Sequence, residues 1–167
     1  MENIINQPKF QEELKHIAKE QKKDLSEIKK EAEDCIAELY AEQSPIANIM
    51  TLKSFDYLMS KAYEDKIDVR PQEIKKLTKL MRQNSVAFIL THKTYLDTVV
   101  LINTLTRYGM PIPYTFGGIN LAVPGFKQLG KNSGLIFIRR SFKDNPVYKA
   151  SLRHYISHLI QNGAHLT

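Results

Sequence analysis

Cysteine is almost absent from this sequence, since Cys35 is the only one. A single cysteine excludes an internal disulfide and a zinc site built from several cysteines, and it fits a reducing compartment. The longest apolar runs, VAFIL and LIFI, fall far short of the roughly 20 residues that a membrane-spanning helix needs. The segment MENIINQPKF also lacks the basic start and apolar stretch of a signal peptide. We therefore expect any membrane contact to be peripheral, or to lie outside this chain.

Glycine is missing from residues 1–83, and all seven glycines lie from Gly109 onward. The glycine-free part is rich in Glu, Lys, Gln and Ala, and its apolar residues recur at helical steps of three and four. This pattern predicts helices over residues 8–22, 24–40 and 45–63, and a fourth helix that starts with Pro71. Residues 1–83 are therefore predicted to form a helical lead-in.

Strand-like runs begin after this lead-in, in residues 84–167. They read SVAFILTH, IPYTFGG and GLIFIRR, and their continuous apolar character favours strands that are buried on both faces. Helical patterns over residues 94–107 and 145–161 alternate with them. The alternation predicts an α/β domain over residues 84–167, in which helices flank a sheet.

The charge balance is basic. Lys and Arg number 24 and Asp and Glu 18, which gives a net charge of +6 and an isoelectric point near 9.3. Such a balance favours anionic partners, namely nucleic acid, acidic lipid surfaces or phosphorylated substrates, and does not choose among them.

A histidine and an aspartate flank the junction between the first predicted strand and the helix after it. Thr94 is a good N-cap and Asp97 follows three residues later, so Asp97 fits a capping box and His92 then merely ends a strand. The same spacing also lets the Asp97 carboxylate reach back to His92. An aspartate that accepts from Nδ1–H of a histidine leaves Nε2 free to take a proton as a general base. Both interpretations stay open on spacing alone.

Two arginines end the last strand-like run, GLIFIRR. Arg139 and Arg140 are either a solvated charged rim or a phosphate clamp, because the planar guanidinium grips phosphate through two parallel hydrogen bonds. The adjacent glycines Gly117 and Gly118 could bring backbone N–H groups close to a ligand, although Gly-Gly pairs mostly mark turns.

Taken together, these segments resemble the glycerol-3-phosphate acyltransferase family, within the wider H-x4-D glycerolipid acyltransferases. HKTYLD matches the first family motif, with His92 and Asp97 in the defining positions. GLIFIRR matches the second, with Arg140 at the motif arginine. The ordered set over residues 86–162 is more specific than either motif alone. The lead-in resembles, less specifically, the segment before the catalytic domain in bacterial members.

The resemblance implies acyl transfer to the 1-hydroxyl of sn-glycerol 3-phosphate, from acyl-CoA or acyl-carrier protein, at the cytoplasmic side of the cell membrane. His92 would take the hydroxyl proton, Asp97 would orient His92, and Arg140 with Arg139 would hold the phosphate. A thiolate leaving group has a pKa of about 8.5 by analogy with cysteine, so no metal or other cofactor is expected.

The chain departs from the family at two motifs. Neither the third motif, Glu-Gly-x-Arg-Ser, nor a fourth built around proline is present. We therefore expect an incomplete acyltransferase sheet, a fragment of a longer enzyme with little activity on its own.

The alternative function is a non-catalytic basic module that binds nucleic acid or an acidic surface. The sequence shows no RNP-like aromatic pattern, zinc finger or recognition helix, so no nucleic-acid partner is expected. His154 and His158 are four residues apart on a predicted helix, but no third metal ligand accompanies them, so no metal site is predicted.

Overall fold

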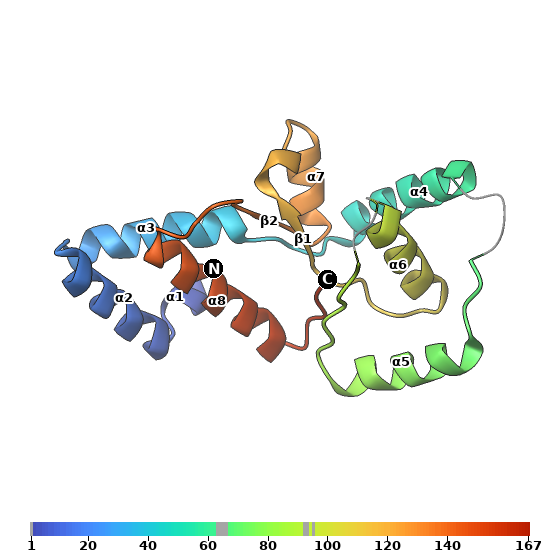
Figure 1. Ribbon diagram of the computed structural model, residues 1–167, viewed down its shortest axis with the longest axis horizontal. Helices are drawn as coiled ribbons and strands as arrows, with labels where there is room; N and C mark the ends of the chain where they lie inside the picture. Colours follow the sequence, from blue (N-terminus) through green and yellow to red (C-terminus); the bar gives the residue numbers. More distant parts are fainter. Residues whose placement is uncertain (1, 63–66, 92–93, 95) are drawn as a thin grey trace.

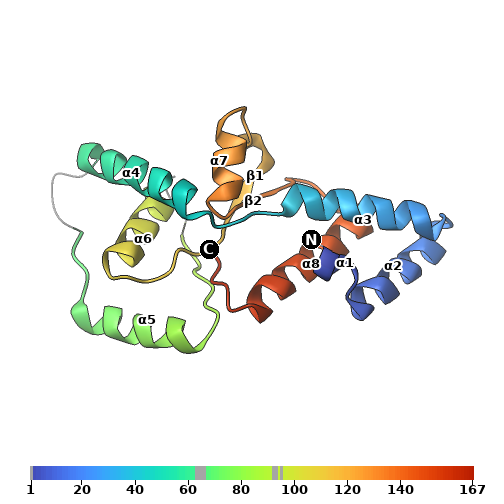
Figure 2. The same cartoon turned by 180° about the vertical axis from the view of Figure 1, so that it is seen from behind.

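The computed structural model describes residues 2–62, 67–91, 94 and 96–167. Its elements follow the chain as α1 (Glu2–Ile5), α2 (Pro8–Gln21), α3 (Leu25–Leu39), α4 (Pro45–Ala62), α5 (Pro71–Gln83), α6 (Leu96–Arg107), β1 (Thr115–Gly118), the 3-10 helix η1 (Ile119–Leu121), α7 (Phe126–Asn132), β2 (Leu135–Ile138) and α8 (Pro146–Gln161). The molecule is elongated. Helices α1, α2, α3 and α8 gather at one end and α4, α5 and α6 at the other, with the strands and α7 between them (Figures 1 and 2).

The helices begin and end where the sequence favours it. Asp24 caps α3, since its carboxylate accepts a hydrogen bond from the backbone N–H of Ser26 at 2.7 Å. Proline takes the first position of α2, α5 and α8, where a missing N–H costs little. The predicted helices are therefore confirmed over the described residues. Within that part of the chain, no helix combines the length and apolar character that crossing a bilayer requires.

The main hydrophobic core lies between α2, α3, α8 and β2. Its fully buried side chains include Phe10, Leu14, Ile28, Ile36, Leu39, Ile136, Val147, Tyr148 and Tyr155. Cys35 lies in the same core, and burial raises the pKa of its thiol to about 11. Helices from the first part of the chain thus pack directly on the last one. The predicted boundary between residues 83 and 84 stays a prediction.

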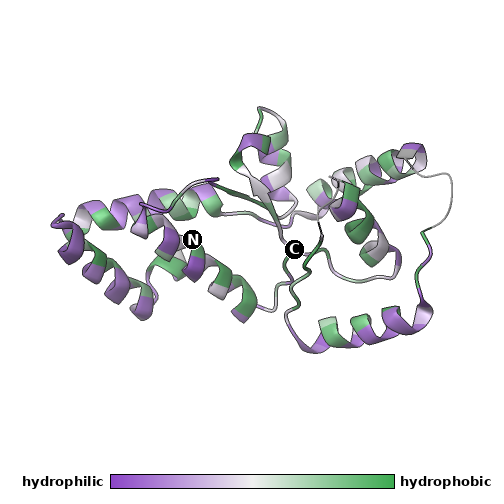
Figure 3. Cartoon of the chain, in the orientation of Figure 1, coloured by the Kyte–Doolittle hydropathy of each residue, from purple (hydrophilic) through white to green (hydrophobic). Residues whose placement is uncertain are grey.

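A smaller apolar cluster holds the other end of the molecule together. Met81 of α5, Leu105 of α6 and Met110 are buried against one another. Helix α5 alternates hydrophobic and hydrophilic segments along its length, as an amphipathic helix does, and its apolar face joins this cluster (Figure 3).

The strands form a parallel sheet. In β1 and β2, Thr115 lies opposite Leu135 and Gly118 opposite Ile138. On the other side of β1, Leu166 makes one parallel bridge to Tyr114 and a second to Ala87. The order in space is therefore 86–88, 165–167, β1 and β2, which confirms the predicted α/β class.

The run at residues 85–91 differs from the predicted buried strand. It pairs only through an isolated bridge, where the Phe88 N–H donates to the Leu166 oxygen at 2.8 Å. Among the described residues, only 165–167 pair with this run, and they lie along one of its edges. Ile89 is therefore left 95% exposed. The expectation of burial on both faces is wrong here. It is confirmed for β2, where Ile136 and Phe137 are both fully buried.

Replacing Tyr155 by phenylalanine is expected to destabilise the main core. The Tyr155 hydroxyl accepts from the Ala41 N–H at 2.9 Å and donates to the Ala41 oxygen at 3.3 Å, so its loss leaves two buried backbone groups without a partner. The free energy of unfolding, measured by urea denaturation, should fall by about 1–3 kcal/mol. Tyr57→Phe on the exposed side of α4 is the control and should change little. An equal change in both variants would contradict this role.

Lowering the pH is expected to weaken the hydrogen bond between His165 and Val86, which joins residues 165–167 to the run before α6. Burial lowers the pKa of His165, and its Nδ1 accepts from the Val86 N–H at 3.1 Å, so the folded chain holds the neutral ring. Histidine in an unfolded chain has a pKa of about 6.5. Below that pH the unfolded state binds more protons than the folded state, so the free energy of unfolding falls as the pH drops through this value. His165→Gln should flatten this fall in thermal melts. An unchanged pH slope would contradict the prediction.

Candidate functional site

The site lies where the two parallel strands end. Gly118 closes β1, and Arg139 and Arg140 follow β2, so these residues share one edge of the sheet. A cavity of about 420 Å³ opens beside this edge. Its walls come from α4, α6, β1, η1, α7 and β2, and its lining residues are Thr51, Phe55, Thr98, Val99, Ile102, Thr115, Phe116, Gly117, Gly118, Asn120, Leu121, Phe126, Leu129, Gly130, Ser133, Leu135 and Arg140.

The first turn of α6 reaches this cavity through Thr98, next to the predicted site residue Asp97. The capping box is confirmed. One Asp97 oxygen accepts from the Thr94 N–H at 3.1 Å and the other from the Thr94 hydroxyl at 3.2 Å, while the Thr94 hydroxyl oxygen accepts from the Leu96 N–H at 3.2 Å. His92 lies outside the described residues, so its contact with Asp97 stays a prediction.

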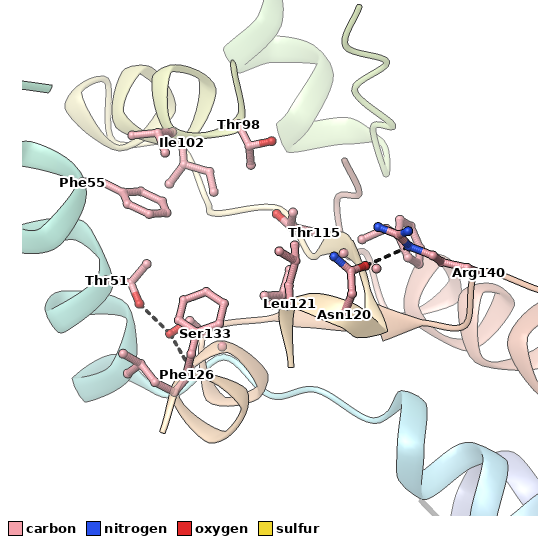
Figure 4. A pocket seen from close by; sticks show the side chains of 17 residues that line it. Thr51, Phe55, Thr98, Ile102, Thr115, Asn120, Leu121, Phe126, Ser133 and Arg140 are labelled. Carbon is pink, nitrogen blue, oxygen red and sulfur yellow. Dashed lines mark hydrogen bonds between the residues drawn. The ribbon is translucent and has the colours of Figure 1, made fainter. Parts of the chain in front are cut away.

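Arg140 lines the cavity and is held from one side. Its Nε–H donates to the Oδ1 of Asn120 at 3.1 Å, which leaves the terminal nitrogens of the guanidinium for other acceptors. In Figure 4 this pair stands at one end of the cavity, and Phe55, Ile102 and Phe126 lie toward the other. One cation therefore marks the polar end of a mainly apolar space.

Arg139 points elsewhere. Its Nε and a terminal nitrogen grip the Glu38 carboxylate of α3 at 2.9 and 2.5 Å, and its guanidinium lies 4.5 Å from the centre of the Tyr148 ring. The hydrogen bonds to Glu38 raise the pKa of Arg139. Successive residues of an extended chain face opposite sides, so the structure separates the two predicted phosphate ligands. Of the two, only Arg140 lines the cavity.

Gly117 and Gly118 both line the cavity, and neighbouring side chains leave little room for a Cβ atom at either position. A Cβ on Gly118 would sit 2.5 Å from Asn120 Oδ1, and one on Gly117 would sit 3.1 Å from a Leu135 methyl group. A side chain at residue 118 would therefore displace the partner of Arg140.

Sequence reasoning missed several cavity residues. Asn120 lies two residues after the Gly-Gly pair, and its place in FGGIN was the signal that could have found it. Thr51 and Phe55 of α4 carry no such signal, since α4 has apolar residues on more than one side. The Thr51 and Ser133 hydroxyls are 2.8 Å apart, and the buried hydroxyl oxygen of Thr115 has no hydrogen-bond partner among the described residues.

The arrangement suits an elongated amphiphile. Aromatic and branched side chains fill most of the wall, the Arg140 cation can bind an anionic group, and the positive end of α6 opens nearby. No group of three or more His, Cys, Asp or Glu side chains in the described part of the chain is placed to hold a metal ion.

Comparison with known proteins gives a consistent result. A family model described as Acyltransferase matches residues 70–167. The acyltransferase plsB1 of Mycobacterium tuberculosis strain H37Rv is 33% identical over 158 residues, which is 95% of this chain and 25% of that protein. Dihydroxyacetone phosphate acyltransferases of Bos taurus and Homo sapiens are 25% and 24% identical over 167 residues, each covering 96% of this chain and 24% of theirs. The chain thus spans about a quarter of the length of the curated relatives it matches.

Removing the Asn120 side chain is expected to loosen Arg140. Without the Oδ1 acceptor, the Arg140 Nε–H should exchange with solvent several-fold faster, as one weak neutral acceptor is lost. The measurement is proton exchange of arginine Nε–H groups by nuclear magnetic resonance in Asn120→Ala. The Arg139 Nε–H, bound to Glu38, is the internal control and should not change. Equal exchange of Arg140 in both proteins would contradict the assignment.

Proposed function

This chain belongs to the Acyltransferase family, and we propose that it carries the acceptor side of a glycerolipid acyltransferase site. The reaction moves a fatty acyl group from acyl-CoA or acyl-carrier protein to the 1-hydroxyl of sn-glycerol 3-phosphate, as the first step of phospholipid synthesis. The observation that carries this proposal is the single held arginine, Arg140, at the polar end of an apolar cavity.

Arg140 is the proposed phosphate ligand. A guanidinium fixed through Nε presents its remaining N–H groups in a plane that matches two phosphate oxygens. Arg139 is assigned a structural part instead, because its fork is already occupied by Glu38. The glycines Gly117 and Gly118 leave room beside this position for a ligand close to the backbone.

The proposed chemistry needs one proton transfer. His92 takes the proton of the attacking hydroxyl as its oxygen adds to the thioester carbonyl, and the carbon–sulfur bond then breaks. The departing thiolate receives the proton. Asp97 already fixes the helix start through Thr94, and a carboxylate has lone pairs enough to hold His92 as well. The capping role and the orienting role are compatible.

Dihydroxyacetone phosphate is the competing acceptor, since two of the relatives are named for it. It shares the phosphate and one hydroxyl with glycerol 3-phosphate, so Arg140 and His92 would serve either. The ratio of kcat/KM for the two acceptors decides between them.

The lipid product places the reaction at a membrane. We propose peripheral binding on the cytoplasmic side of the cell membrane, supported by the net charge of +6. On an acidic leaflet each well-placed Lys or Arg adds about 1 kcal/mol of attraction.

Acyl transfer by the protein from the complete reading frame that contains these residues tests the function. His92→Ala should lower kcat by about 100-fold or more, because the general base is lost. Arg140→Ala should raise KM for glycerol 3-phosphate by about 10–100-fold, which corresponds to one charge-assisted contact. The measurement is radiolabelled acyl transfer from the thioester donor.

Two matched arginine variants sharpen this test. Arg82→Ala removes an exposed cation of α5 and should leave KM unchanged. Arg139→Ala should lower the melting temperature through loss of the Glu38 pair, with less effect on KM than Arg140→Ala. A larger KM change at Arg139 than at Arg140 would overturn the assignment, and full activity of His92→Ala would overturn the proposed chemistry.

A further inference from the structure

Helix α4 is apolar on two opposite sides. Its inner side supplies Thr51 and Phe55 to the cavity wall, and Met59 is buried there as well. The outer side nevertheless carries large apolar residues, with Ile46 73% and Tyr57 64% exposed. Large apolar side chains that gather on an exposed surface commonly mark an interaction site, so the outer side calls for a partner.

The outer residues form one stripe. Ile46, Ile49, Met50 and Tyr57 recur at helical steps, and Lys53 and Lys61 lie within the same arc. We call these six residues the α4 outer stripe. The Lys61 ammonium lies 5.9 Å from the centre of the Tyr57 ring. Lysine and tyrosine both carry a long apolar body and a polar tip, which suits the boundary between lipid and water.

The charge of α4 has one sign on this side. Asp56 is the only acidic residue of the helix, and its carboxylate accepts from the Nδ2–H of Asn103 on α6 at 2.5 Å. Asp56 is exposed, and this hydrogen bond directs its carboxylate toward α6. The stripe therefore combines apolar side chains with two lysines, which complements an anionic lipid surface.

A second copy of the chain fits this face less well. In a symmetric dimer the same patch meets itself, and the lysine in the middle of the stripe, Lys53, would approach its own copy. Like charges brought together at the centre of an apolar contact disfavour such a pair.

We infer that the α4 outer stripe docks the protein on an anionic lipid bilayer. Ile46, Ile49 and Met50 enter the boundary region, and Lys53 and Lys61 extend to the lipid phosphates. The inference rests on the proposed function, because an enzyme that makes a lipid product has a reason to bind a bilayer. A helix with its side chains is only about 10 Å thick, so docking sets the cavity close to the lipid.

Vesicle flotation of the 167-residue chain tests this surface. The chain should bind vesicles of phosphatidylglycerol and phosphatidylcholine more strongly than vesicles of phosphatidylcholine alone. Replacing both Ile46 and Ile49 by Glu should lower partitioning by about tenfold or more, because two buried apolar side chains are lost. Lys53→Gln with Lys61→Gln should lower binding to the anionic vesicles only, by about fivefold for each charge.

Ile160→Glu on α8 is the matched control, since this isoleucine is exposed to a similar degree as Ile49. It should leave partitioning unchanged. Circular dichroism checks that each variant folds, and Met50→Ser carries the test if the isoleucine pair does not. The inference is overturned if vesicle partitioning is unchanged in the stripe variants, or if Ile160→Glu lowers it by the same factor. A dimer that Ile46→Glu dissociates, without vesicle binding, assigns the stripe to a second copy and overturns it too.

Transfer activity separates this inference from the proposed function. Transfer by the protein from the complete reading frame, with substrates in detergent micelles, does not require a bilayer. Intact transfer with no vesicle binding overturns the docking surface alone. Vesicle binding that depends on the stripe, without transfer under any condition, overturns the function alone and supports the docking surface.

Discussion

The ion pair between Glu38 and Arg139 determines how β2 leaves the sheet. It ties the end of that strand to α3, with the Arg139 guanidinium also lying against the Tyr148 ring of α8. The next residue, Arg140, turns away from α3 and lines the cavity. The helical end of the molecule thus orients the group that would bind substrate at the other side of the sheet.

Local sequence patterns predicted the elements well, because caps and apolar spacing act over a few residues. Asp24 caps the start of α3, and Thr94 with Asp97 forms the expected capping box before α6. The failure at residues 85–91 has a long-range cause. Whether Ile89 is covered depends on which segments flank it in the sheet, and residues 165–167 are about 80 positions away along the chain.

The candidate site divides in the same way. The candidate residues Arg140, Gly117 and Gly118 line the cavity, and their contacts with a ligand stay a prediction. Nothing local distinguishes Arg139 from Arg140, because the difference lies in Glu38, which is distant in sequence. The wall from α4 was equally hidden. A helix with apolar residues on two opposite sides gives no indication of which face meets the cavity, and only the fold turns Phe55 inward.

The buried cysteine of α3 bears on the order of chemical events. Burial raises the pKa of the Cys35 thiol to about 11, so the side chain is held as the thiol at neutral pH. Cys35 is 1% exposed in the main core and does not line the cavity, so its sulfur is not placed to take the acyl group from the proposed thioester donor. In the proposed reaction Cys35 is therefore not an acyl carrier, and nothing among the described residues around it prepares it to relay the acyl group from donor to acceptor.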